Sequence, residues 1–129
     1  MFSSLIFITN IVTAFYKKYY LHCILFICLT ITSVSYHYDH SNIYIKILDI
    51  FFILAIILYI IYSLYNKTSR GNLNHIIVIL ITFLFTTFLF FYGYCVKNYC
   101  FHPDKYISSI YHCMLHIISS LGNHFITFL

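Results

Sequence analysis

Five long stretches of the sequence consist mainly of apolar residues, and short polar segments separate them. A helix needs about 20 predominantly apolar residues to cross a bilayer. The first stretch is shorter, but the lysines that follow it can extend its reach by snorkelling. We therefore expect one domain over residues 1–129, an all-α bundle of about five transmembrane helices. Their approximate ranges are 2–16, 19–38, 43–65, 75–96 and 106–129.

The composition supports a multi-pass integral membrane protein, with an endomembrane or a host membrane both open as its location. Of the 129 residues, 62% are hydrophobic and only 8% are charged. A soluble domain of this size needs far more charge on its surface. The seven basic residues are scattered rather than gathered in a run, so no nucleic-acid partner is expected. The only carboxylate side chains are three aspartates, which excludes mechanisms that need many carboxylates.

Polar residues within three of the apolar stretches are spaced for a common site. His112 and His116 are four positions apart, as are Ser33 and His37, and residues with this spacing share one face of a helix. Asp49 lies near the beginning of the third stretch. With five crossings, all five groups fall on the same side of the membrane at similar depth. Titratable residues inside membrane spans are costly, which makes them candidates for function.

The residue types in this group are typical of a catalytic zinc centre. Three histidines with one open coordination position form such a centre, where zinc lowers the pKa of a bound water to about 7. We predict that His37, His112 and His116 bind zinc. Asp49 is expected to act as general base, and Ser33 to donate a hydrogen bond to the water or to an oxyanion. A site of this kind facing lipid suits hydrolysis of an amide or ester bond in a membrane lipid.

The same residues resemble the signature of a known family, the CREST superfamily, which includes alkaline ceramidases and adiponectin-receptor-like proteins. The resemblance is carried by Ser33-x3-His37, by Asp49, and by His112-x3-His116-x4-Leu121-Gly122. It implies a shortened form of a seven-helix fold in which the histidines hold zinc and the aspartate and serine flank the metal. The ending from His112 to Gly122 is especially similar to alkaline ceramidases and Per1-like members, and the resemblance implies a ceramidase-like hydrolase. Because the chain has room for five helices rather than seven, a homo-oligomer that completes the cavity is a further alternative. The alternative is a non-catalytic protein of this fold with a lipid-binding, fusion or assembly role.

Some of these residues also have simpler interpretations. Asp49 is able to pair with Lys46, its i−3 neighbour on the same helix. Ser33 is able to bond a carbonyl of its own helix, as serine often does in membranes. Cys95 and Cys100 flank a loop and would form a disulfide in an oxidising compartment.

Other histidines are expected to stand apart from the site. His22 is expected to be interfacial or solitary, and Asp39 and His40 are expected in a solvated loop. A haem-binding function ranks below the others, because an i,i+4 pair on one helix does not place its ligands on opposite sides of a haem.

Overall fold

The computed structural model describes residues 2–67 and 73–128, and the described chain is almost entirely helical. Its elements begin and end within a few residues of the expected ranges, so the predicted all-α bundle is confirmed. The last residue of the expected fifth helix, Leu129, lies outside the described residues. In chain order the elements are η1 (Phe2–Ile6), α1 (Phe7–Tyr16), α2 (Tyr20–Tyr38), α3 (Ile43–Lys67), α4 (Leu73–Thr87), η2 (Phe88–Tyr92), α5 (Gly93–Val96), η3 (Tyr99–Phe101) and α6 (Lys105–Phe128). The expected fourth helix is thus α4 and α5 joined by the π-helical turn η2.

Local signals in the sequence account for the helix ends. Asn42 accepts a hydrogen bond from the backbone N–H of Tyr44, and Asp104 accepts one from Tyr106, so each caps the helix that follows it. Pro103, the only proline, directly precedes the Asp104 cap, where a missing N–H does no harm. Lys97 takes a left-handed conformation (φ 52°) and ends α5.

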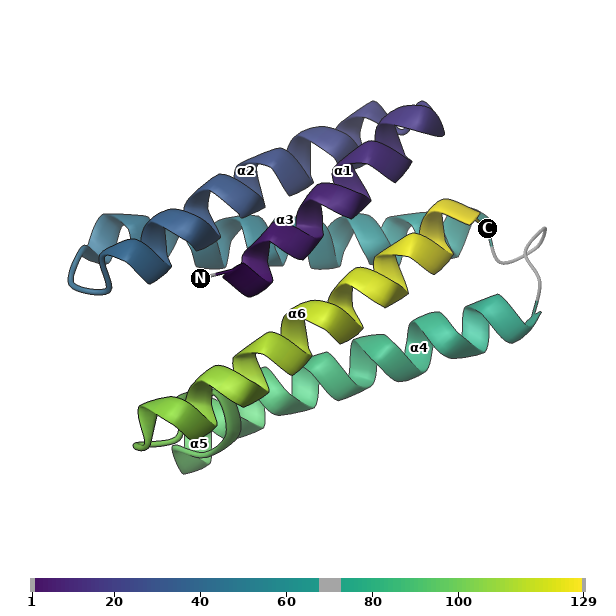
Figure 1. Ribbon diagram of the computed structural model, residues 1–129. Helices are drawn as coiled ribbons and strands as arrows, with labels where there is room; N and C mark the ends of the chain where they lie inside the picture. Colours follow the sequence, from purple (N-terminus) through teal and green to yellow (C-terminus); the bar gives the residue numbers. More distant parts are fainter. Residues whose placement is uncertain (1, 68–72, 129) are drawn as a thin grey trace.

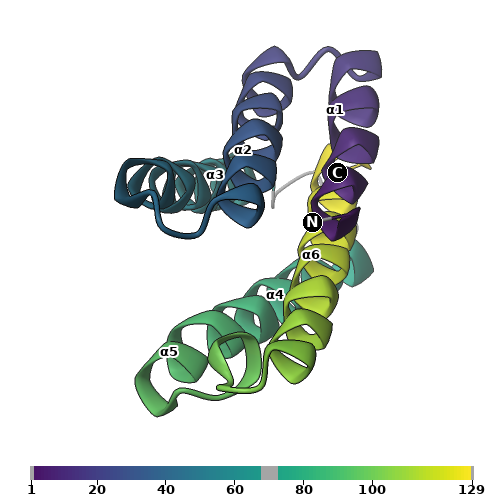
Figure 2. The ribbon, with the colours of Figure 1, turned by 60° about the vertical axis from the view of Figure 1, so that its left-hand side comes forward.

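The helices form two groups that diverge from each other, and we call the region between the groups the wedge. In the first group α2 packs against both α1 and α3, and in the second α4 packs against α6. Figure 1 shows α1 lying between α2 and α6, and Figure 2 shows the two groups from the side. Contacts of η1 and α1 with α6 join the groups. The buried core lies where they meet, and its residues are Phe7, Phe26, Leu29, Ile56, Ile60, Ile79 and Ile126.

Three helices are long and apolar enough to cross a membrane, by length and composition, among the residues described. They are Tyr20–Tyr38, Ile43–Lys67 and the combined helix Leu73–Val96. The expectation of five spans is therefore met only in part. The first apolar helix, Ser3–Tyr16, is short, and α6 has 24 residues but carries many serines and histidines.

A close contact between α6 and α4 depends on a glycine. A Cβ atom added to Gly122 would lie 3.1 Å from Thr82 Cβ and closer still to Thr82 Oγ1. Small residues let helix backbones approach in this way in membrane proteins. The glycine of the Leu121-Gly122 pair therefore has a packing role in this fold.

We expect Gly122→Ala to destabilise the protein by about 1–3 kcal/mol, since the added methyl group forces α4 and α6 apart. The measurement is the unfolding midpoint of the detergent-solubilised protein. Leu121→Ala is the matched control, because the Leu121 side chain is 48% exposed. Equal midpoints for wild type and Gly122→Ala would contradict the close packing of these two helices.

Candidate metal centre

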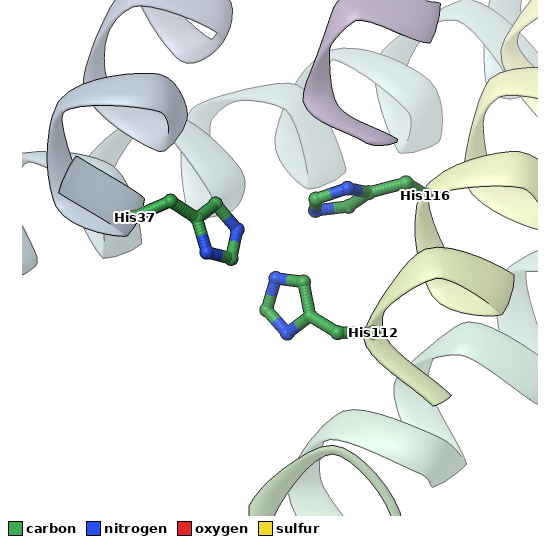
Figure 3. Close-up of side chains that lie close together, drawn as sticks. All are labelled: His37, His112 and His116. Carbon is green, nitrogen blue, oxygen red and sulfur yellow. The ribbon is translucent and has the colours of Figure 1, made fainter. Parts of the chain in front are cut away.

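Three histidine rings from two helices converge at one end of the bundle (Figure 3). One ring nitrogen from each of His37, His112 and His116 lies within 4.8 Å of the others. The ring centres of His112 and His116 are 4.5 Å apart, and that of His37 is 4.8 Å from His112. The structure thus brings together the three histidines that the sequence singles out.

The surrounding helices explain why the rings meet. His112 and His116 are one helical turn apart on α6, and His37 stands in the last turn of α2. The helix between them, α1, packs against α2 and is bonded to α6 by Asn10. Asn10 Nδ2 donates to the carbonyl of Ser120 at 3.0 Å, and Ser120 Oγ donates to Asn10 Oδ1 at 2.6 Å. These contacts set the position of α2 relative to α6.

Two serines in η1 contact the site, and sequence patterns did not predict them. Ser3 Oγ lies 3.0 Å from Nδ1 of His116, and Ser4 Oγ lies 2.8 Å from Ser33 Oγ. The ring of Phe7 packs against His116 with 5.0 Å between the ring centres. Serines in an apolar run usually bond their own helix, so only the tertiary contacts reveal them.

Ser33 is buried, and the structure gives its hydroxyl a partner outside its own helix. The alternative for Ser33 was a hydrogen bond to a carbonyl in the preceding turn of α2. Ser35, two residues further along the helix, makes such a bond, because it donates to the carbonyl of Ile31. Ser33 also faces the cavity described below. Its hydroxyl is therefore placed toward the site rather than used by the helix.

Asp49 is held by a threonine. Thr32 Oγ1 on α2 donates to Asp49 Oδ1 on α3 at 3.0 Å. The expected alternative, an ion pair with Lys46, is not found in the part of the chain that the structure describes. One carboxylate oxygen is thus fixed by a neutral donor, and Asp49 lines the same cavity as His112 and His116.

A cavity of about 520 Å³ extends from the histidines into the wedge between the helix groups. It follows α6 from His112 to Ile126, a rise of about 21 Å at 1.5 Å per residue. The lining is mainly apolar, with side chains such as Ile56, Ile79 and Ile126, but polar residues also line it, from Ser33, Asp49, His112 and His116 to Thr82 and Asn123. His37 is not among the lining residues. Its volume is in the usual range for a ligand pocket, roughly 300–1,000 Å³.

The residues expected in the solvated loop are exposed. Asp39 accepts hydrogen bonds from the side chain and the backbone N–H of Ser41, and these bonds lower the pKa of Asp39. The His40 ring centre lies 5.8 Å from that of His37, but His40 does not belong to the cluster of ligand atoms.

His22 stands apart from the metal cluster, as one of its two interpretations has it. It is 1% exposed, and its ring packs against those of Phe26 and Tyr59. Cys95 and Cys100 are both free thiols, so the alternative of a disulfide between them is not found.

The donor set fits a zinc ion. Tetrahedral zinc with Zn–N distances of 2.0–2.1 Å places its ligand nitrogens about 3.4 Å apart, which small side-chain rotations reach from separations of at most 4.8 Å. Nε2 of His37 is buried and has no hydrogen-bond partner among the described residues. A buried polar atom without a partner is rare, and a bound ion would supply the partner. Three imidazoles leave the fourth position open, as in catalytic zinc sites.

No protein-family model, curated protein or solved structure matches this chain. The relation to the CREST superfamily therefore stays a prediction that rests on the residues of the site.

We expect the purified protein to bind about one zinc ion per chain, and His112→Ala/His116→Ala to bind none, because two of three ligands are lost. The measurement is metal content of detergent-solubilised protein after exposure to zinc and removal of the excess. His75→Ala/His102→Ala is the control, since it removes two histidines outside the cluster. Folded wild-type protein without metal would contradict the assignment.

Proposed function

We propose that this protein is a zinc-dependent membrane hydrolase that cleaves an amide or ester bond in a lipid, a shortened relative of the alkaline ceramidases. The observation that carries the proposal is the cluster of three histidines, two of which, His112 and His116, line one end of a long and mainly apolar cavity. A reactive centre at one end of such a cavity suits a substrate with a polar linkage and a hydrocarbon tail.

The proposed roles follow from the contacts of each residue. His37, His112 and His116 would hold zinc, which supplies Lewis acidity and an activated water when bound. Asp49 accepts the proton of the attacking water, because Thr32 engages Oδ1 and leaves Oδ2 available. Ser33 donates a hydrogen bond to the oxygen that becomes negative as the carbonyl is attacked.

The shape of the cavity favours an acyl chain as the group that is bound. Burying a methylene group in an apolar site contributes about 0.8 kcal/mol, so a chain along the cavity provides substantial binding energy. The cavity lies between α3 and α4, which belong to different helix groups. A lipid would therefore enter sideways, from within the bilayer.

The same proposal extends to the membrane arrangement. Besides the three apolar helices, η1 with α1 and α6 would also cross, which gives five spans in an endomembrane or a host membrane. Because the chain has room for only five helices, a homo-oligomer that completes the cavity also belongs to the proposal.

A non-catalytic, lipid-binding protein of the same fold is the second candidate. The apolar cavity favours it, because the lining would bind a hydrocarbon chain whether or not the histidines hold zinc. Turnover of lipid separates the two candidates.

We expect Asp49→Asn to reduce hydrolysis of a lipid amide or ester by about 10²–10⁴-fold, as removal of a general base does, while zinc content stays unchanged. The assay follows release of labelled fatty acid from a ceramide and from a phospholipid in mixed micelles. Asp39→Asn is the matched control, because Asp39 is an exposed loop aspartate. Equal turnover by Asp49→Asn and wild type would rule out Asp49 as the base. Lipid binding without turnover in wild type would favour the second candidate.

A further inference from the structure

The turn η1 lies against two site residues that belong to different helices. Ser3 contacts His116 of α6, and its neighbour Ser4 contacts Ser33 of α2. Ser4, Ser33 and His116 are 0%, 3% and 4% exposed, and Ser3 is half-buried. The contact between Ser4 and Ser33 is therefore closed to water, and the one between Ser3 and His116 is shielded on the histidine side. Among the described residues, the Ser3 hydroxyl is the only hydrogen-bond partner of His116 Nδ1, and the Ser4 hydroxyl is the only partner of Ser33 Oγ.

From these contacts we infer that Ser3 is a positioning residue of the metal centre and that it sets the tautomer of His116. This inference rests on the zinc site proposed above. A ligating histidine commonly uses its second ring nitrogen to donate a hydrogen bond, and this bond fixes the ring orientation. At His116 the second nitrogen is Nδ1, and the atom 3.0 Å away is Ser3 Oγ.

The tautomer follows from the contact. With the proton on Nδ1, His116 donates to Ser3 Oγ and keeps the lone pair of Nε2 for the metal. Phe7 packs against the same ring and restricts its rotation. Without the Ser3 hydroxyl, the buried Nδ1–H has no acceptor, and the opposite tautomer, which cannot bind through Nε2, becomes more populated.

Ser4 has a different role in the same turn. Its hydroxyl contacts Ser33 and not a metal ligand. When Ser4 donates to Ser33 Oγ, the Ser33 proton stays free to point into the cavity that Ser33 lines. The two adjacent serines are therefore predicted to act on separate properties, Ser3 on metal affinity and Ser4 on the orientation of Ser33.

The test compares Co²⁺ affinity of full-length wild type, Ser3→Ala, Ser3→Thr and Ser4→Ala in detergent, by chelator competition and visible absorption. We expect Ser3→Ala to weaken Co²⁺ binding by about 10–100-fold and to alter the absorption spectrum of the bound ion. Ser3→Thr keeps a hydroxyl and should restore affinity to near the wild-type value. Ser4→Ala should bind Co²⁺ as wild type does.

The pattern across variants separates this inference from simple packing. Equal losses in Ser3→Ala and Ser4→Ala would mean that the turn only supports the fold, and would overturn the inference. Wild-type affinity in Ser3→Ala would overturn it while leaving the zinc site intact. Failure of wild type to bind Co²⁺ or Zn²⁺ would overturn both the inference and the proposed hydrolase. Ser35→Ala is the matched control, because its hydroxyl bonds a carbonyl of its own helix.

Discussion

A reciprocal pair of hydrogen bonds between α1 and α6 supports the whole site. Asn10 and Ser120 are both buried, and each donates one bond to the other. Because α1 also packs against α2, this pair fixes the distance from His37 to the histidines of α6. Separating the helices would leave buried polar groups unsatisfied at about 1–3 kcal/mol each. A single polar contact between membrane helices contributes about 0.6 kcal/mol on average. The contact between α1 and α6 is stronger because Asn10 and Ser120 make two hydrogen bonds with each other.

The arrangement of α6 explains why its average composition is a poor guide to its surroundings. His116, Ser120 and Asn123 are buried, whereas Ile117 and Leu121 are each 48% exposed. The side of α6 that faces the rest of the protein is therefore largely polar, and the side that faces outward is largely apolar. This is the reverse of a helix in a soluble protein and the order expected of a helix surrounded by lipid. A hydropathy average over the helix mixes the two faces, which is why α6 is not among the three apolar spans and yet fits the proposed five.

The sequence predicts the elements and part of the site because both depend on local spacing. Runs of apolar residues predict the helices. The i,i+4 spacing places His112 and His116 on one face of their helix, and five crossings place that face on the same side of the membrane as His37. The contacts of Ser3 and Ser4 could not be predicted, because they depend on which helices pack side by side. A serine in an apolar run gives no indication of whether it bonds its own helix, as Ser35 does, or another element. The divergence of the two helix groups could not be predicted either, because hydrophobic periodicity does not specify which helices pack against each other.

The partner of Asp49 decides whether this carboxylate is available for chemistry. A lysine beside a carboxylate stabilises its ionised form and so makes it a weaker acceptor for a proton. Asp49 instead accepts one bond from a neutral hydroxyl, that of Thr32, which positions the group without neutralising its charge. Thr32 Oγ1 also lies 3.1 Å from the carbonyl of Leu29 in its own helix, so its single proton is shared between that carbonyl and Asp49 Oδ1, and α2 sets its position. The helix that carries His37 thereby also orients Asp49 on α3, and one rigid element aligns a proposed metal ligand with the proposed base.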